Sequence, residues 1–97
     1  MTDPIIDAQK TVAQLIHKLA QPASDDMVAA GWTVGARLGV LEALRRAQRE
    51  LAGGKLEALD GLSRSLDHRG IHGDLADKAA EAEALLLRAR REFSGDT

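Results

Sequence analysis

The segment from Ser24 to Ala52 constrains the fold more than any other part of the chain. It is rich in helix-forming residues, and Gly31, Gly35 and Gly39 lie four residues apart within it, so that on a helix they trace one slowly drifting stripe. Each glycine inside a helix costs about 1 kcal/mol relative to alanine, and a neighbouring backbone packed closely against the bare stripe would offset this cost. The opposite side of the helix carries apolar side chains: Met27, Val34, Leu38, Leu41 and Leu44. The pattern therefore predicts a long helix that is buried on nearly all sides.

The length of this predicted helix indicates self-association. About 28 residues span roughly 40 Å at 1.5 Å per residue, whereas a compact chain of this length has a diameter of about 32 Å. The helix would extend beyond its own domain, and a second copy of the chain is the simplest cover for the overhang. Three interpretations of the glycine stripe remain open: an interface with another chain, packing against the chain's own first and last helices, or a break of the helix at one glycine.

We favour the interface and predict a homodimer whose seam follows the stripe. Trp32 is either an interface anchor, as tryptophans often are, or a plain core residue. Arg37 is the only charge in the apolar stretch, and its stem can pack while its guanidinium reaches water or a carboxylate. The predicted interface residues are Val28, Gly31, Trp32, Gly35, Arg37, Leu38 and Gly39.

Three further helices are predicted from capping residues and apolar spacing. The first begins after Asp3, an N-cap residue followed by proline, and ends before Pro22, because the residue preceding a proline is disfavoured in the helical region. Another covers Leu56 to His68, with leucines along one stripe. The last begins at Asp74 and carries apolar residues at heptad spacing: Leu75, Ala79, Ala82, Leu86, Ala89 and Phe93.

These elements predict an all-α fold with four helices, the long second one in the centre, arranged as a homodimeric helical bundle. Most of the 44% hydrophobic fraction is Leu and Ala, which are strong helix formers, and β-branched residues never alternate over a strand-length run. We expect one helical domain over residues 1–97, with 94–97 as a polar tail. A chain of 97 residues buries only about two-thirds of its unfolded surface, so oligomerisation would add to a thin stability margin.

Composition restricts the classes of function. The chain has no cysteine, which excludes disulfides, a catalytic thiol and thiolate metal sites and suits a reducing cytoplasm. An acidic start without a long apolar core argues against a signal peptide, and charges interrupt every stretch long enough to span a membrane. The net charge of -2 gives no general attraction to nucleic acid. Frequent Arg and absent Asn and Tyr suggest a GC-rich bacterial or phage genome, and we expect a cytoplasmic protein.

The residues capable of catalysis or metal binding form no convincing site. His68 and His72 stand four apart, which on an unbroken helix would allow a shared metal. Gly70 interrupts such a helix, however, and Ile71 supplies the hydrophobic contact typical of a glycine-capped helix end. The serines lack the sequence of a nucleophile elbow, and Gly53-Gly54-Lys55 falls short of a phosphate-binding loop. We therefore predict no enzyme activity, no metal and no cofactor.

Two groups of arginines lie near the ends of predicted helices, where cations meet the negative end of the dipole. The groups are Arg45, Arg46 and Arg49, and Arg88, Arg90 and Arg91. The chain has almost no aromatic residues to stack on bases, so we interpret these arginines as solvated and helix-stabilising. Nucleic acid is accordingly not an expected partner.

The expected function is that of a non-enzymatic regulator that binds itself and a second protein, which it sequesters or blocks. In length and composition the chain resembles small helical bacterial regulators such as anti-activators and secretion chaperones, although this likeness rests on no motif. Two alternatives remain open. A structural part of a phage or secretion assembly would form higher oligomers, and a small nucleic-acid-associated factor would show salt-sensitive binding.

Overall fold

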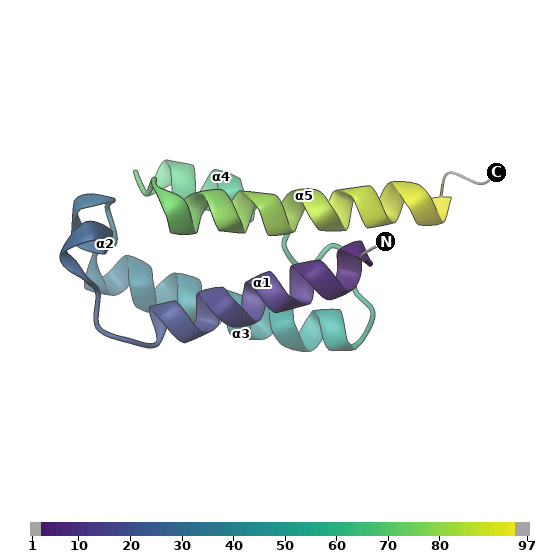
Figure 1. Cartoon of the computed structure of the whole chain (residues 1–97), viewed down its shortest axis with the longest axis horizontal. Helices are drawn as coiled ribbons and strands as arrows, with labels where there is room; N and C mark the ends of the chain where they lie inside the picture. Colours follow the sequence, from purple (N-terminus) through teal and green to yellow (C-terminus); the bar gives the residue numbers. More distant parts are fainter. Residues whose placement is uncertain (1–2, 95–97) are drawn as a thin grey trace.

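The computed structural model of the chain describes the backbone of residues 3–94 and the side chains of residues 3–92. Five helices and no strand occur in this part (Figure 1). Within it, no helix is both long and apolar enough to cross a membrane. The all-α prediction is confirmed, with five helices in place of four. Their bounds are α1 Pro4–Leu19, α2 Asp25–Ala29, α3 Val34–Ala52, α4 Leu62–His68 and α5 Asp74–Ser94.

Three long helices, α1, α3 and α5, run lengthwise through a molecule that measures 47 × 22 × 21 Å. α1 packs against both α3 and α5, and α4 packs against α5. α1 runs in the opposite direction to the other two long helices, and α2 lies across the end where α1 stops and α3 starts (Figure 1). The central helix is therefore α1, and not the second segment as the sequence suggested.

Apart from Trp32, the core consists of small and branched aliphatic side chains. Alanines on α1 and α5 leave room for the two helices to approach closely, and leucines and valines fill the space between these positions. The predicted heptad seam of α5 is confirmed at Ala79, Ala82, Leu86 and Ala89, which are buried. Leu75 is half-buried, and the side chain of Phe93 lies outside the described residues.

The predicted long helix is interrupted, and this corrects the expectation drawn from its length. Gly31 has φ +101°, a left-handed conformation that a helix interior cannot contain. A new helix then begins, because the Thr33 side chain accepts a hydrogen bond from the Ala36 amide at 3.1 Å, as an N-cap residue does. α3 has 19 residues and is roughly 28 Å long, so it fits within the 47 Å length of the molecule. No overhang remains to be covered.

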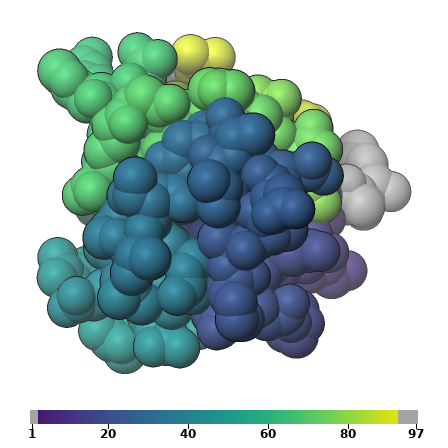
Figure 2. All heavy atoms as spheres, turned by 90° about the vertical axis from the view of Figure 1, so that its left-hand side faces the viewer, coloured from purple at the N-terminus to yellow at the C-terminus, as the bar shows by residue number. Residues whose placement is uncertain are grey.

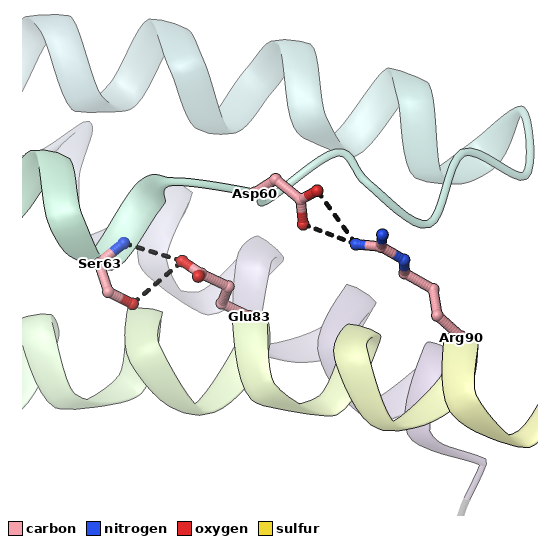
Figure 3. Close-up of polar contacts among 4 residues, drawn as sticks. All are labelled: Asp60, Ser63, Glu83 and Arg90. Carbon is pink, nitrogen blue, oxygen red and sulfur yellow. Dashed lines mark hydrogen bonds and ion pairs between the residues drawn. The ribbon is translucent and has the colours of Figure 1, made fainter.

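The third predicted helix also begins later than expected, at Leu62 and not at Leu56. Turns occupy residues 56–61, and Gly61, with φ +83°, offers no side chain to cap α4. The cap comes instead from α5, where the Glu83 carboxylate accepts from the Ser63 backbone amide at 2.9 Å and from its hydroxyl at 3.0 Å. Figure 3 shows this contact beside a second link between α5 and the turns, in which Arg90 donates to Asp60 at 2.9 Å.

Other helix ends lie where the sequence predicted them. The Asp3 carboxylate accepts from the Ile5 amide at 2.9 Å and begins α1, and α5 begins at Asp74. After α4, Gly70 adopts φ +73°, and the following Ile71 is buried while its amide donates to Leu66 at 3.0 Å. This is the glycine cap with its hydrophobic contact. The predicted tail is helical up to Ser94, and residues 95–97 lie outside the described part.

Candidate protein-binding surface

The three glycines of the predicted stripe have three different surroundings. A Cβ built on Gly31 would lie 2.6 Å from the carbonyl oxygen of Gly70, so the close backbone approach at this position is made within the chain. A Cβ on Gly35 would meet no atom within 4 Å, and one on Gly39 would meet only the Arg69 guanidinium, at 3.5 Å or more. Gly35 and Gly39 are therefore exposed, with only the Arg69 side chain beside Gly39, whereas Gly31 serves the chain's own fold.

Apolar side chains flank the two exposed glycines. Val34 is 68% exposed and Leu38 is 51% exposed, and both lie one position before a glycine on the first two turns of α3. The sequence placed these side chains opposite the stripe, on a face expected to be covered. We call Val34, Gly35, Leu38 and Gly39 the α3 face. It combines two large apolar side chains with two positions that have none.

α2 extends this surface around the end of the bundle. Val28 is 61% exposed, and no residue of α2 is buried. Figure 2 views the end of the molecule where α2 and the start of α3 lie on the outside. Val28, predicted as an interface residue, is thus open to solvent at the same end as the α3 face.

Two predicted interface residues have structural roles inside the chain. Trp32 is only 3% exposed and belongs to the core, which is the second of the two roles considered for it. Arg37 donates from one Nη1 atom to the carbonyl oxygens of Leu19 at 2.8 Å and Gln21 at 2.9 Å. A cation bound to the last carbonyls of a helix offsets the negative end of its dipole, so Arg37 fixes the end of α1 against α3.

The rest of the outer surface of α3 is charged. Glu42, Arg45, Arg46 and Arg49 are all exposed, and in the described part none of them takes part in an ion pair. Charged residues are depleted at the centres of protein interfaces. On α3, the large exposed apolar side chains are therefore restricted to the first two turns.

The histidine and serine candidates do not assemble into a reactive site. His68 ends α4, and His72 lies beyond the left-handed Gly70, so the two histidines do not share a helix face. Among the described residues, no three His, Cys, Asp or Glu side chains gather in a way that could hold a metal ion. The Ser63 hydroxyl donates to the Glu83 carboxylate at 3.0 Å, and the Ser24 hydroxyl accepts from the Met27 amide at 3.3 Å. Both serines thus have structural hydrogen bonds.

Comparisons with known proteins identify no relatives. No protein-family model matches the chain, and no curated protein or solved structure is significantly similar to it. The likeness in length and composition to small helical bacterial regulators gains no support from these comparisons. A role for the chain has to be inferred from its exposed side chains and their surroundings.

Proposed function

We propose that this chain is a non-enzymatic interaction protein that binds a helix of another protein chain through the α3 face, and that a second copy of itself is one such partner. Acting on a different protein, it would sequester that partner by mass action. The α3 face would cover an apolar surface that the partner needs for its own assembly. A bacterial regulator of this kind requires no cofactor.

The observation that carries the proposal is the exposure of Val34 and Leu38 beside two exposed glycines, of which Gly35 has no neighbouring atom at the position of a Cβ. Complete burial of a valine or leucine side chain contributes roughly 1.5–3 kcal/mol, and more than half of that surface is still exposed on each residue here. Gly39 lies inside α3 and costs up to about 1 kcal/mol relative to alanine, whereas Gly35 is the second residue of the helix and costs less. No contact within the chain offsets the cost at Gly35. A partner helix seated on the α3 face would bury the apolar side chains and pack closely where the side chains are missing.

The size of a stable interface indicates that α2 belongs to the same contact. A standard interface covers about 800 Å² on each partner, which is about one-eighth of the 6277 Å² surface of this chain. Four residues of α3 cannot supply that area. α2, which carries the exposed Val28, lies at the same end of the bundle as the start of α3 (Figure 2), so the proposed seam runs from the α3 face onto α2.

Sedimentation velocity over a concentration series tests the self-association. We expect reversible dimerisation in the native chain and a rise of at least about tenfold in the dissociation constant for Leu38→Glu, because a charge would be buried without a partner. Leu87→Glu is the matched control: Leu87 is 40% exposed on α5, outside the proposed seam, and this variant should dimerise like the native chain.

Two results would contradict the proposal. If the native chain stays monomeric at millimolar concentration, the proposed homodimer is ruled out. Co-purification from the native host then tests the second partner, and a protein retained equally by Leu38→Glu and Leu87→Glu would show that the α3 face is not its binding site.

A further inference from the structure

A groove runs along the seam between α1 and α5 and continues beneath α2. It consists of two adjoining hollows of about 440 and 540 Å³ that share Lys18, Leu75 and Lys78. None of the residues of the α3 face lines either hollow. The groove is therefore distinct from the α3 face, although α2 borders both the groove and the proposed seam, and what is inferred from it does not require the α3 face to bind a partner.

The floor of the groove is apolar. Leu15 and the half-buried Leu75 lie in the hollow between α1 and α5, and Met27 and Trp32 lie in the hollow beneath α2. Methionine adapts its shape to different apolar partners. Along α1 the lining extends from Ala13 to Lys18, about 7.5 Å of helix axis. This length suits one or two turns of a bound segment, with a single bulky apolar side chain as its anchor.

The rim of the groove is cationic where α1 meets α5. Lys18 and Lys78 come from different helices, and both are exposed. In the described residues the ion pairs are Arg88–Glu92 and Arg90–Asp60, so neither lysine has a carboxylate within ion-pair distance. Asp26 and Asp74 line the hollow beneath α2, which both lysines also border, whereas no carboxylate among the described residues lines the hollow between α1 and α5. Two lysines without an ion pair on the rim of that hollow are complementary to a ligand with carboxylates.

We infer that this groove binds an acidic amphipathic segment of another protein. One large apolar side chain of that segment enters between Leu15 and Leu75, and carboxylates on either side of it pair with Lys18 and Lys78. Apolar contact supplies the affinity, while the lysines select for acidic sequences and accelerate association. The occupant is a segment of a separate protein, and a second copy of this chain is the alternative that the sedimentation measurement below detects.

Two synthetic helical peptides of 16 residues test the inference. Both carry the same leucine stripe and no tryptophan; one has glutamates beside the stripe and the other has lysines. Trp32 is the only tryptophan and lines the groove, so its fluorescence reports occupancy. We expect the acidic peptide to bind at least about tenfold more tightly than the basic one, and salt to reduce this difference.

Charge reversal provides the decisive comparison. Lys18→Glu/Lys78→Glu should reverse the preference between the two peptides, while Lys10→Glu/Lys55→Glu, which changes the net charge equally at exposed lysines outside the groove, should keep the native preference. Equal reversal in both double variants, or no preference in the native chain, would overturn the inference. The sedimentation coefficient is also measured without peptide. If it changes in Lys18→Glu/Lys78→Glu but not in Lys10→Glu/Lys55→Glu, the occupant is a second copy of this chain, and the inference is overturned. Leu38→Glu should bind the acidic peptide normally, which separates this test from that of the α3 face.

Discussion

Gly31 lies directly against the backbone of Gly70, so closely that a Cβ on Gly31 would be 2.6 Å from the carbonyl oxygen of Gly70. A hydrogen bond beside this contact, from the His72 amide to the Ala30 carbonyl oxygen at 2.9 Å, joins the same two turns. The turn before α3 is thus held against the turn that follows α4. This pairing across the fold accounts for the break in the helix that the sequence suggested was continuous.

Gly31→Ala should lower the free energy of unfolding by about 1–3 kcal/mol. Alanine is strained at φ +101°, and its Cβ would displace the backbone of Gly70. Urea unfolding measures the change as a lower midpoint with an unchanged slope. A midpoint equal to that of the native chain would show that the two turns are not held together as described.

Gly35→Ala should have the opposite effect on the isolated chain. Because no atom lies within 4 Å of the added Cβ, the substitution gains helix propensity and raises the free energy of unfolding by up to about 1 kcal/mol. The same methyl group would obstruct a partner backbone on the α3 face, so self-association should weaken. Urea unfolding at low concentration and sedimentation at high concentration measure the two effects separately. Stronger or unchanged association in this variant would contradict close helix packing at Gly35.

Local signals were sufficient to predict most of the helix ends. The side chains of Asp3 and Ser24 cap helices by accepting from amides two and three residues later. Gly70 and Ile71 complete the cap at the end of α4 within one turn. Such interactions are encoded in short stretches of sequence, and the apolar periodicity of α5 is equally local. The all-α class could be predicted for the same reason.

A break at one glycine was one of three interpretations of the stripe, and the sequence did not single it out, because part of its cause is distant in the sequence. The Thr33 cap that begins α3 is a local signal, but the contact of Gly31 with Gly70 joins residues 39 positions apart, whereas a Cβ on Gly35 meets no atom within 4 Å. The start of α4 depends in the same way on Glu83, which is twenty residues from Ser63. Contacts of this kind exist only after the helices have packed.

The candidate site could be predicted only in part. Four of the predicted interface residues are exposed: Val28, Gly35, Leu38 and Gly39. Val34 was expected on the buried side of the helix, and it is exposed too. Periodicity shows which residues share a face, while the rotation of α3 about its axis is fixed by its packing on α1. That rotation buries Leu41 and Leu44 and leaves the side chains of the first two turns open.

Arg37→Ala should lower the free energy of unfolding by about 1–2 kcal/mol. The guanidinium donates to the Leu19 and Gln21 carbonyl oxygens, and a charged donor contributes about 1.5–3 kcal/mol, which partial exposure reduces. Arg45→Ala is the control, because Arg45 is exposed and should change stability by less than about 0.5 kcal/mol. Equal urea midpoints for the two variants would show that Arg37 does not fix the end of α1.

Glu83→Ala should loosen α4 without unfolding the long helices. The Glu83 carboxylate is the N-terminal cap of α4, since Gly61 has no side chain to offer, and loss of a cap costs about 1 kcal/mol. Hydrogen exchange should therefore accelerate at the amides of residues 62–68, with little change in the central part of α1. Glu83→Gln keeps an oxygen acceptor and should retain part of the protection, while Glu81→Ala, at an exposed position on the same helix, should retain all of it. Uniform acceleration across the chain in Glu83→Ala would mean that α4 does not open separately, and that its anchoring to α5 is part of the global stability.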